Sequence, residues 1–306
     1  MEMRKLGQSD LNVSCIGLGT NYVGGYGLYP SIDEAEGIRL VHKALDLGVT
    51  FLDTADIYGF GRSEELVGQA IAGRRNEVVL ATKGANVFSN GERTGVSNEP
   101  AYLRAALEAS LKRLGTDYVD LYYIHRHDDC TPVEDSFGEL MRMKEEGLIR
   151  AAGVSNYEPE QVRGALQAGP VDALQSRYNM LQREVEAEVL PLCAANSISF
   201  IPWGPLAFGL LGGNYAADFV LPADDWRHRS GVFDEDCFAA NIATVDALKA
   251  VATTSLPHVA TQWLLHQQAV TSVIAGAKTV SQVEQNARAS SLSLTPDQVE
   301  ALNGCL

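Results

Sequence analysis

Cysteine and positive charge are both scarce in this sequence. Its five cysteines include no C-x-x-C pair, and an odd number does not suit a disulfide framework. We therefore expect a reduced, cytoplasmic protein in which the cysteines are small buried hydrophobic side chains or bystanders. The formal net charge is -15 at pH 7, and no stretch rich in lysine and arginine opposes it. A phosphate backbone would be repelled, so we expect no nucleic-acid partner.

The sequence also lacks a segment suited to cross a membrane. Residues 189–217 carry no charged side chain, but they contain Pro191, Pro202, Pro205 and several glycines. A spanning helix of about 20 residues rarely tolerates these together, so we expect a buried strand followed by a glycine-rich loop. Residues 1–10 have no apolar core of the kind found in a signal peptide. We therefore expect neither export nor a membrane partner.

Short apolar runs alternate with amphipathic helical stretches along the chain. A leader at residues 4–13 predicts a hairpin, and the expected strands are residues 15–18, 50–53, 77–82, 118–124, 149–154, 171–175, 198–203 and 271–274. Strict alternation predicts a parallel sheet, because each parallel pair needs a crossover long enough to hold a helix. Eight such units in 306 residues, with no Pro/Ser-rich linker, favour an α/β fold. We predict a closed (β/α)8 TIM barrel that spans residues 1–306 as one domain.

An open doubly wound sheet is the alternative fold. It would need G-x-G-x-x-G after an early strand, and residues 17–22 lack the third glycine. Ser31 and Thr131 each lie three residues before a glutamate, which predicts reciprocal caps at two helix N-termini. Gly48 and Gly115 follow apolar stripes and are expected to end two helices. Residues 204–238 form an unusually long connection, which we expect to be functional.

Polar side chains follow the expected strands at the end where a barrel of this kind carries its reactive groups. Asp53 ends the second strand, and Tyr58 lies five residues beyond it. Lys83 ends the third strand, and His125 follows the fourth. Because these strand ends meet at one mouth of the barrel, we expect the four side chains to lie together.

Five separated motifs resemble those of the aldo-keto reductases in order and spacing: DTADIYG from residue 53, ATKG, YIHRHD, GVSN and VIAGAKTVSQVEQN. The similarity covers essentially the whole chain, including the leader and IGLGTNYVGG at residues 16–25. It is nearest to the bacterial inositol-operon and general-stress branch of that family. The resemblance implies an enzyme that reduces aldehydes or ketones to alcohols with NADPH (NADP+), with NADH as a second possibility.

The resemblance also implies a role for each of the four clustered side chains. Tyr58 would be the general acid, Lys83 its activator, Asp53 the partner of Lys83, and His125 the residue that orients the carbonyl. A free phenol has a pKa of about 10, and a lysine cation at about 4 Å favours its ionised form by about 4 kcal/mol before desolvation. His125 can donate a hydrogen bond to the developing oxyanion only if a neighbouring group fixes its tautomer.

The resemblance further implies that a nicotinamide dinucleotide lies across the barrel mouth. Ser155, Asn156 and Gln175 match the positions that hold the carboxamide. Trp203 matches the ring that stacks on the nicotinamide, and Lys278 matches a basic residue that contacts the 2′-phosphate. The other matched cofactor positions are Gly19, Thr20, Asn21, Asp53, Gly204, Pro205, Leu206, Gly209, Leu210, Gly276, Gln282, Gln285 and Asn286.

Two positions depart from the family pattern at the expected cofactor site. Gln285 stands where an acidic residue commonly contacts the adenine, and Asn214 replaces the lysine commonly found in GLLxGK. Loss of that lysine removes one positive charge from a chain that is already strongly acidic. We therefore expect a modest affinity for the cofactor and a preference for NADP over NAD that is less than absolute.

The substrate is the least predictable part of the site. Aromatic residues at the strand ends and in the long loop could line a pocket for sugar, aromatic or aliphatic carbonyls, namely Tyr22, Tyr26, Tyr29, Phe88 and Trp226. Each could equally cover the core. Arg126, Arg227 and Arg229 could recognise an anionic substrate, although solvated surface arginines are common.

Other functions remain open at this point. A barrel aldolase could use Lys83 as a Schiff-base nucleophile. An NAD(P)-dependent sugar or alcohol dehydrogenase could work in the oxidative direction, and a binding module could hold the cofactor without turnover. His125, His127, Asp128 and Asp129 could ligate a metal, but the other strand ends supply no further histidine, so we expect no metal site.

Overall fold

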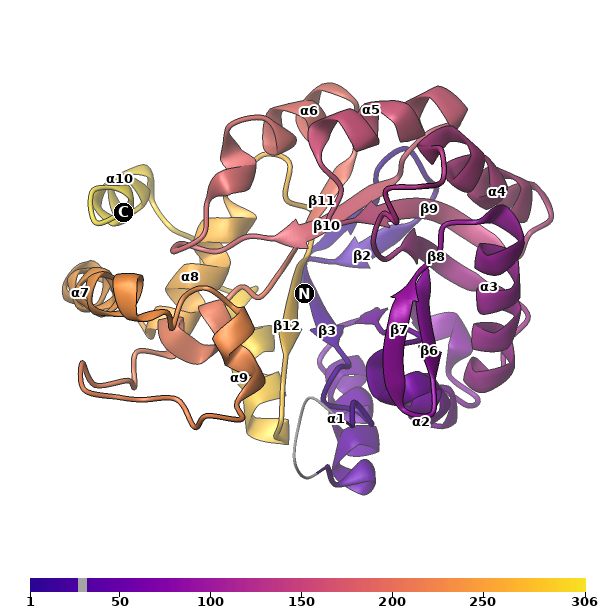
Figure 1. The fold of residues 1–306 in the computed structure, drawn as a ribbon. Helices are drawn as coiled ribbons and strands as arrows, with labels where there is room; N and C mark the ends of the chain where they lie inside the picture. Colours follow the sequence, from indigo (N-terminus) through magenta and orange to yellow (C-terminus); the bar gives the residue numbers. More distant parts are fainter. Residues whose placement is uncertain (27–31) are drawn as a thin grey trace.

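A computed structural model of the chain describes residues 1–26 and 32–306. Its centre is a closed barrel of parallel strands in chain order: β3 (Ile16–Gly19), β4 (Phe51–Asp53), β5 (Val79–Gly84), β8 (Val119–Ile124), β9 (Ile149–Ser155), β10 (Ala173–Arg177), β11 (Ser199–Trp203) and β12 (Val273–Gly276). Strand β12 pairs with β3 and closes the ring. Each predicted strand overlaps one of these, so the TIM barrel is confirmed and the open-sheet alternative is wrong (Figure 1).

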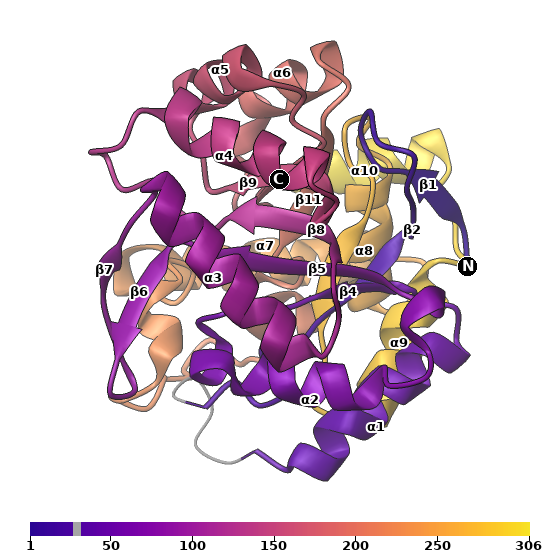
Figure 2. The ribbon, with the colours of Figure 1, turned by 90° about the vertical axis from the view of Figure 1, so that its right-hand side faces the viewer.

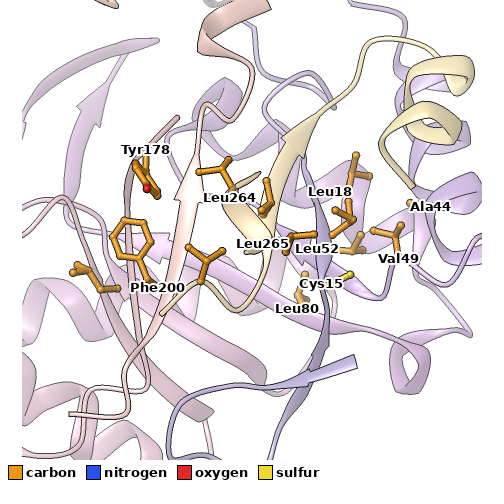
Figure 3. Close-up of a cluster of buried hydrophobic side chains, with 14 of the residues drawn as sticks. Cys15, Leu18, Ala44, Val49, Leu52, Leu80, Tyr178, Phe200, Leu264 and Leu265 are labelled. Atoms are coloured by element: carbon orange, nitrogen blue, oxygen red, sulfur yellow. The ribbon is translucent and has the colours of Figure 1, made fainter. Parts of the chain in front are cut away.

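Helices surround the barrel (Figure 1). They are α1 (Glu34–Asp46), α2 (Arg62–Ala70), α3 (Pro100–Leu114), α4 (Val133–Glu145), α5 (Pro159–Ala168), α6 (Val189–Ala195), α7 (Glu235–Val251), α8 (Leu256–Leu265), α9 (Val280–Ala289) and α10 (Pro296–Asn303). Figure 3 shows part of the apolar layer between strands and helices, in which Leu18, Leu52 and Ala44 belong to one buried cluster. In the described ranges, no helix is long and apolar enough to cross a membrane.

Of the two predicted N-terminal caps, one lies outside the described residues and the other is wrong. Helix α1 begins after Asp33, whose carboxylate accepts from the backbone N–H groups of Ala35 and Glu36. Ser31, the predicted cap, lies outside the described residues. Thr131 does not cap α4, because Pro132 occupies the cap position and the Thr131 hydroxyl donates instead to Asp128 at 2.8 Å. Glycine does end α3 as predicted, with Gly115 in the left-handed conformation at φ 65°.

A hairpin closes the end of the barrel at which the strands begin. Strands β1 (Met3–Lys5) and β2 (Asn12–Ser14) pair in antiparallel fashion, as the leader predicted. Leu6, Leu11 and Val13 are buried in a cluster with side chains of the barrel interior. The Gly7 N–H donates to Ser199 Oγ at 2.8 Å, which ties the hairpin to β11. The barrel therefore has an apolar floor.

A second hairpin, which the sequence analysis did not predict, stands at the opposite end. It consists of β6 (Asn86–Ser89) and β7 (Glu92–Val96), and Figure 2 shows it on the side of the barrel away from β1 and β2. Asn90 and Gly91 form its tip with φ angles of 53° and 76°. Positive φ at both positions is what a tight two-residue hairpin turn requires, and Asn-Gly satisfies it best.

The segment without charged residues contains more regular structure than predicted. Helix α6 comes first, the expected strand is β11, and the glycine-rich stretch forms the 3-10 turn η4 (Ala207–Gly212). Shorter 3-10 turns lie in other connections: η1 (Tyr58–Gly61), η2 (Arg75–Glu77), η3 (Glu184–Glu186) and η5 (Trp226–Arg229). The cysteines are free thiols, and Cys15 and Cys193 are buried as expected, whereas Cys130 is exposed.

Candidate active site

A buried ion pair lies at the ends of two neighbouring strands. Lys83 on β5 is fully buried, and its Nζ donates to Asp53 Oδ2 at 2.7 Å and to the Thr54 carbonyl at 2.8 Å. The register of β4 and β5 sets Asp53 beside Ala81, two residues before Lys83. Burial opposes the positive charge, but Asp53 and the Tyr58 phenol together raise the pKa of Lys83 above its ordinary value. The ammonium group therefore stays protonated.

Tyr58 and His125 lie over this pair. The Lys83 Nζ is 5.1 Å from the centre of the Tyr58 ring. The Tyr58 ring meets the His125 ring edge to face, with 6.2 Å between their centres. Turn η1 begins at Tyr58, and His125 directly follows β8. The structure thus brings together the four side chains that the sequence singled out as catalytic.

The environment of Tyr58 keeps its phenol protonated. Burial raises the pKa of Tyr58 above its ordinary value, and the Lys83 cation acts in the opposite direction. The expected effect of Lys83 is thus present, but removal of water from the hydroxyl is the larger influence in the protein alone. A phenol in this state holds a proton that it can donate at neutral pH.

His125 has a hydrogen-bond partner that the sequence analysis missed. Its Nδ1 lies 3.0 Å from the Nδ2 of Asn86, the first residue of β6. Burial lowers the pKa of His125 well below its ordinary value, and the cations of Lys83, Arg126 and Arg93 lower it further. The imidazole is therefore neutral near pH 7.

The residues expected to hold the nicotinamide form one connected group. The Trp203 Nε1–H donates to Asn156 Oδ1 at 3.1 Å, and Asn156 Nδ2 donates to Ser155 Oγ at 2.9 Å. The Gln175 side-chain amide donates to Asp53 Oδ1 at 2.9 Å. This last bond joins the expected cofactor group directly to the buried ion pair.

Close backbone packing marks the neighbouring strand ends. Gly19 of β3 pairs with Gly276 of β12. A Cβ atom on Gly276 would meet Asn21 Oδ1 at 3.5 Å. Thr20 is fully buried, and both its N–H and its hydroxyl approach the Asp53 carbonyl, at 2.9 and 3.1 Å, so it joins β3 to β4 rather than offering a group at the mouth.

The loop after β11 has an unusual backbone. Gly204, Ala207, Phe208 and Gly209 all have positive φ angles, of 67°, 47°, 57° and 100°. Three of the expected cofactor residues in this loop have little exposed surface. Leu210 is fully buried, Pro205 is buried and Leu206 is partly buried. Contacts from this loop to a ligand would therefore come mainly from the backbone.

The expected phosphate-binding residues gather between β12 and α9. The Thr279 side chain caps α9 by accepting from the Gln282 N–H, while Gln282 Oε1 accepts from the Lys278 N–H at 2.7 Å. Asn286 Nδ2 donates to the Gly276 carbonyl at 3.2 Å. Gln285 is exposed, and its carbonyl lies 2.9 Å from His258 Nε2.

Comparison with known proteins places the chain in a family. The family model described as "Aldo/keto reductase family" matches residues 15–306. The chain belongs to the aldo/keto reductase family. It is 35% identical over 312 residues to aldo-keto reductase YhdN of Bacillus subtilis, covering 100% of this chain and 94% of that protein. It is 36% identical over 311 residues to aldo-keto reductase yakc [NADP(+)] of Schizosaccharomyces pombe, covering 98% and 89%.

Solved structures agree with the family. The glycerol dehydrogenase AKR11B4 from Gluconobacter oxydans superposes with a TM-score of 0.92 at 32% identity and covers 99% of this chain and 94% of that chain. The holo form of aldo-keto reductase AKR11C1 from Bacillus halodurans gives a TM-score of 0.85 at 30% identity, covering 100% and 96%. This aldo/keto reductase is therefore an oxidoreductase enzyme with the barrel described above.

The candidate substrate residues of this reductase separate into two aromatic groups. Phe88 of β6 contacts Phe60, two residues after Tyr58, with ring centres 5.6 Å apart. Trp226 contacts Phe208 at 5.6 Å, and Phe208 in turn contacts Trp203 at 6.1 Å. Phe88 therefore lies near the turn that begins at Tyr58, whereas Trp226 lies on the side of the expected cofactor group.

The remaining candidates take different positions in the reductase. Tyr26 is 43% exposed and donates to Glu34 at 3.0 Å, while Tyr22 is partly buried against the core. Tyr29 lies outside the described residues. The Arg126 side chain is exposed, and in the described parts of the chain no ion pair holds its guanidinium.

Arg227 lies near Lys278, one of the expected cofactor residues. Its guanidinium pairs with Asp225 at 2.7 Å and donates to the Tyr215 hydroxyl at 2.6 Å. Lys278 is exposed, yet partial desolvation of its ammonium group lowers its pKa, and the nearby Arg227 cation lowers it further while Asp225 acts in the opposite direction. Two cations and the Asp225 carboxylate thus share one region, which leaves a net positive charge that favours an anion there. No sequence pattern announced that Arg227 and Lys278 lie close together, because their proximity depends on how the long loop folds.

Among the polar residues after β8, Asp128 stabilises the connection between β8 and α4 by hydrogen bonds. Asp128 accepts from the backbone N–H groups of Asn98, Cys130 and Thr131. Burial works to raise the pKa of Asp128, but these hydrogen bonds outweigh it and lower the pKa to about 2. Over residues 1–26 and 32–306, no group of three histidine, cysteine or acidic side chains could hold a metal ion.

Proposed function

We propose that this protein is an NADPH-dependent reductase that converts aldehydes or ketones to alcohols, with Tyr58 as the general acid. The observation that carries the proposal is the fully buried Lys83–Asp53 pair beneath the Tyr58 and His125 rings. A buried cation beneath a protonated phenol stabilises the phenolate that proton donation leaves behind. A structural ion pair alone would not require a phenol and a neutral imidazole above it.

The chain's own residues then account for the proton and the charge. A bound dinucleotide would supply a hydride to the carbonyl carbon. As negative charge develops on the carbonyl oxygen, His125 donates a hydrogen bond to it, and the Tyr58 hydroxyl transfers its proton to the same oxygen. The electron pair left on the Tyr58 oxygen faces Lys83, which Asp53 holds in place at 2.7 Å. Solvent returns the proton to Tyr58 after the alcohol leaves.

Several features support NADPH as the cofactor. The Trp203 ring is fixed by its bond to Asn156, so it offers a stable apolar face for a nicotinamide. The paired Gly19 and Gly276 permit close backbone approach. Lys278 and Arg227 lie in one region, and because Asp225 pairs with Arg227 the three groups leave a net positive charge that suits a phosphate. The relative yakc carries NADP(+) in its name.

The oxidative direction is a second candidate, favoured by the similarity to a glycerol dehydrogenase. The same groups can work in reverse, with the Tyr58 phenolate accepting the alcohol proton. The Schiff-base aldolase is disfavoured, because the Lys83 ammonium is protonated and occupied by Asp53 and Thr54. Turnover of alcohols with NADP+ and of carbonyls with NADPH, measured at one pH, separates the two directions.

Tyr58→Phe tests the proposed mechanism. We expect carbonyl reduction to fall by about 100-fold or more, the scale of general acid catalysis. NADPH binding, followed by tryptophan fluorescence, should stay within about twofold of the wild type, because the variant removes one hydroxyl only. Full activity in this variant would falsify the assignment of Tyr58.

A further inference from the structure

We propose that Asn86 is a positioning residue that fixes the proton of His125 on Nε2. In this arrangement His125 always presents an N–H group to the substrate oxygen. The inference rests on the proposed function for its catalytic consequence, but its central claim concerns the location of one proton and can be tested without substrate.

The contact between Asn86 and His125 is held by the backbone on both sides. The His125 N–H donates to the Gly84 carbonyl at 2.9 Å, and Asn86 lies two residues beyond Gly84. Ala85 between them has a φ of 97°, which turns the chain out of β5 and into β6. The Ser97 N–H donates to the Ala85 carbonyl at 2.9 Å and holds that turn. A positive φ at a non-glycine residue is costly, so the surroundings must maintain it.

Asn86 itself has little freedom to move. Asn86 is only 3% exposed, and its backbone pairs with Val96 across the hairpin. The Tyr102 hydroxyl donates to the Asn86 backbone carbonyl at 2.7 Å. The backbone therefore holds Asn86 Nδ2 in place, 3.0 Å from Nδ1 of the His125 imidazole.

The chemistry of the contact decides the tautomer. A carboxamide nitrogen can only donate, so the facing Nδ1 of His125 must accept and cannot carry the proton of a neutral ring. The proton is then on Nε2. The opposite orientation of the amide would face Nδ1 with an oxygen, place the proton on Nδ1 and leave Nε2 as an acceptor. An acceptor at that position would repel a carbonyl oxygen rather than polarise it.

The charges around His125 complement this contact. Lys83, Arg126 and Arg93 are the cations that face the ring, and the protonated Tyr58 phenol lies across it. All three cations oppose a second proton, whereas Asn86 selects the site of the first. Together the three cations and Asn86 keep His125 as a neutral ring that donates from Nε2, and this protonation state does not change around neutral pH. The β6–β7 hairpin thus supplies a component of the catalytic group as well as part of the barrel mouth.

The first experiment is nitrogen NMR of the wild-type protein with 15N-labelled histidine. We expect His125, assigned by its loss in His125→Gln, to give the pattern of a neutral Nε2–H ring from pH 6 to pH 8. A neutral Nδ1–H ring, or an equal mixture of both tautomers, overturns the proposal whether or not the enzyme reduces any carbonyl. This readout is independent of the proposed function.

Asn86→Asp then tests the consequence for turnover. A carboxylate accepts from Nδ1–H and raises the pKa of His125, so the doubly protonated ring can still donate from Nε2 at low pH. Above that pKa the ring keeps its proton on Nδ1 and loses the Nε2 donor. We expect kcat for carbonyl reduction to fall about 10- to 100-fold as pH rises across the neutral range, while the wild-type profile stays flat.

Two further variants complete the test. Asn86→Leu removes the donor without adding charge and should give a mixture of tautomers with a smaller loss of kcat, which keeps the proposal testable if Asn86→Asp does not fold. Tyr102→Phe is the matched control, because it loosens the anchor of the hairpin without changing the partner of Nδ1, and it should leave the tautomer unchanged. An Asn86→Asp enzyme with the wild-type pH profile and the Nε2–H ring contradicts the proposal.

Discussion

The mouth of the barrel has two halves that are built differently. The half at β4, β5 and β8 places its charged groups directly on strand ends and holds them with short hydrogen bonds, such as the 2.7 Å bond from Lys83 to Asp53. The other half, formed by residues 204–238 and the start of α9, depends on aromatic contacts such as those of Phe208 with Trp203 and Trp226. Strand ends fix a proton donor accurately, whereas aromatic surfaces in a loop can adjust around a large ligand.

This difference predicts different costs of substitution in the two halves. A polar group removed from the first half leaves a buried charge without its partner, which affects folding and chemistry together. A group removed from the second half changes a contact to the cofactor and leaves the barrel intact.

Lys83→Met should affect both stability and activity. It leaves Asp53 buried without its cation, so we expect the free energy of unfolding to fall by about 3–5 kcal/mol, together with a loss of activity of at least about 100-fold. The double variant Asp53→Asn/Lys83→Met should recover most of the stability but none of the activity. Urea unfolding and carbonyl turnover measure the two effects. A double variant as unstable as Lys83→Met would contradict the account of the buried pair.

Lys278→Ala tests the loop-built half. Loss of a charged contact to the 2′-phosphate should raise the Kd for NADPH about 10-fold or more, while the Kd for NADH changes less than about twofold. Thermal unfolding should be unchanged, because Lys278 is exposed. Fluorescence titration with each cofactor provides the comparison. Equal weakening for both cofactors would show that Lys278 does not read the 2′-phosphate.

The wild-type pH profile should show the smallest change. The pKa of His125 lies well below its ordinary value and that of Tyr58 lies above it, so neither group changes protonation between pH 6 and pH 8. We expect kcat/KM for reduction to vary less than about threefold over this range and to decline only in alkaline solution as Tyr58 loses its proton. A large change in kcat/KM centred near pH 6.5 would indicate that His125 titrates during catalysis.

The predictability of the site follows the same division into two halves. Asp53, Lys83 and His125 were predictable because parallel strands end at one mouth, so the order of residues in the chain translates directly into proximity. Asn86 was not, because its contact with His125 depends on the positive φ of Ala85, which no sequence pattern announced. The hairpin that carries Asn86 did leave a signal in Asn90-Gly91 that the sequence analysis did not use.

Other outcomes depended on tertiary structure in a similar way. Arg227 was a candidate for an anionic substrate, and in the folded loop its guanidinium bonds to Asp225 and Tyr215 and lies near Lys278. Thr131 matched a capping pattern, but Asp128 competes for its hydroxyl. In each case a local pattern allowed several partners, and only the folded loop determined which one was present.

The N-terminal hairpin places a group of core residues far from the mouth of the barrel. It fills the floor of the barrel with Leu6, Leu11 and Val13, at the opposite end from the β6–β7 hairpin (Figure 2). Stability can therefore be altered at one end of the barrel axis by residues that never approach the reacting atoms. Substitutions in the floor can therefore be used to make the enzyme more stable, while the mouth remains free to be redesigned for a new carbonyl compound.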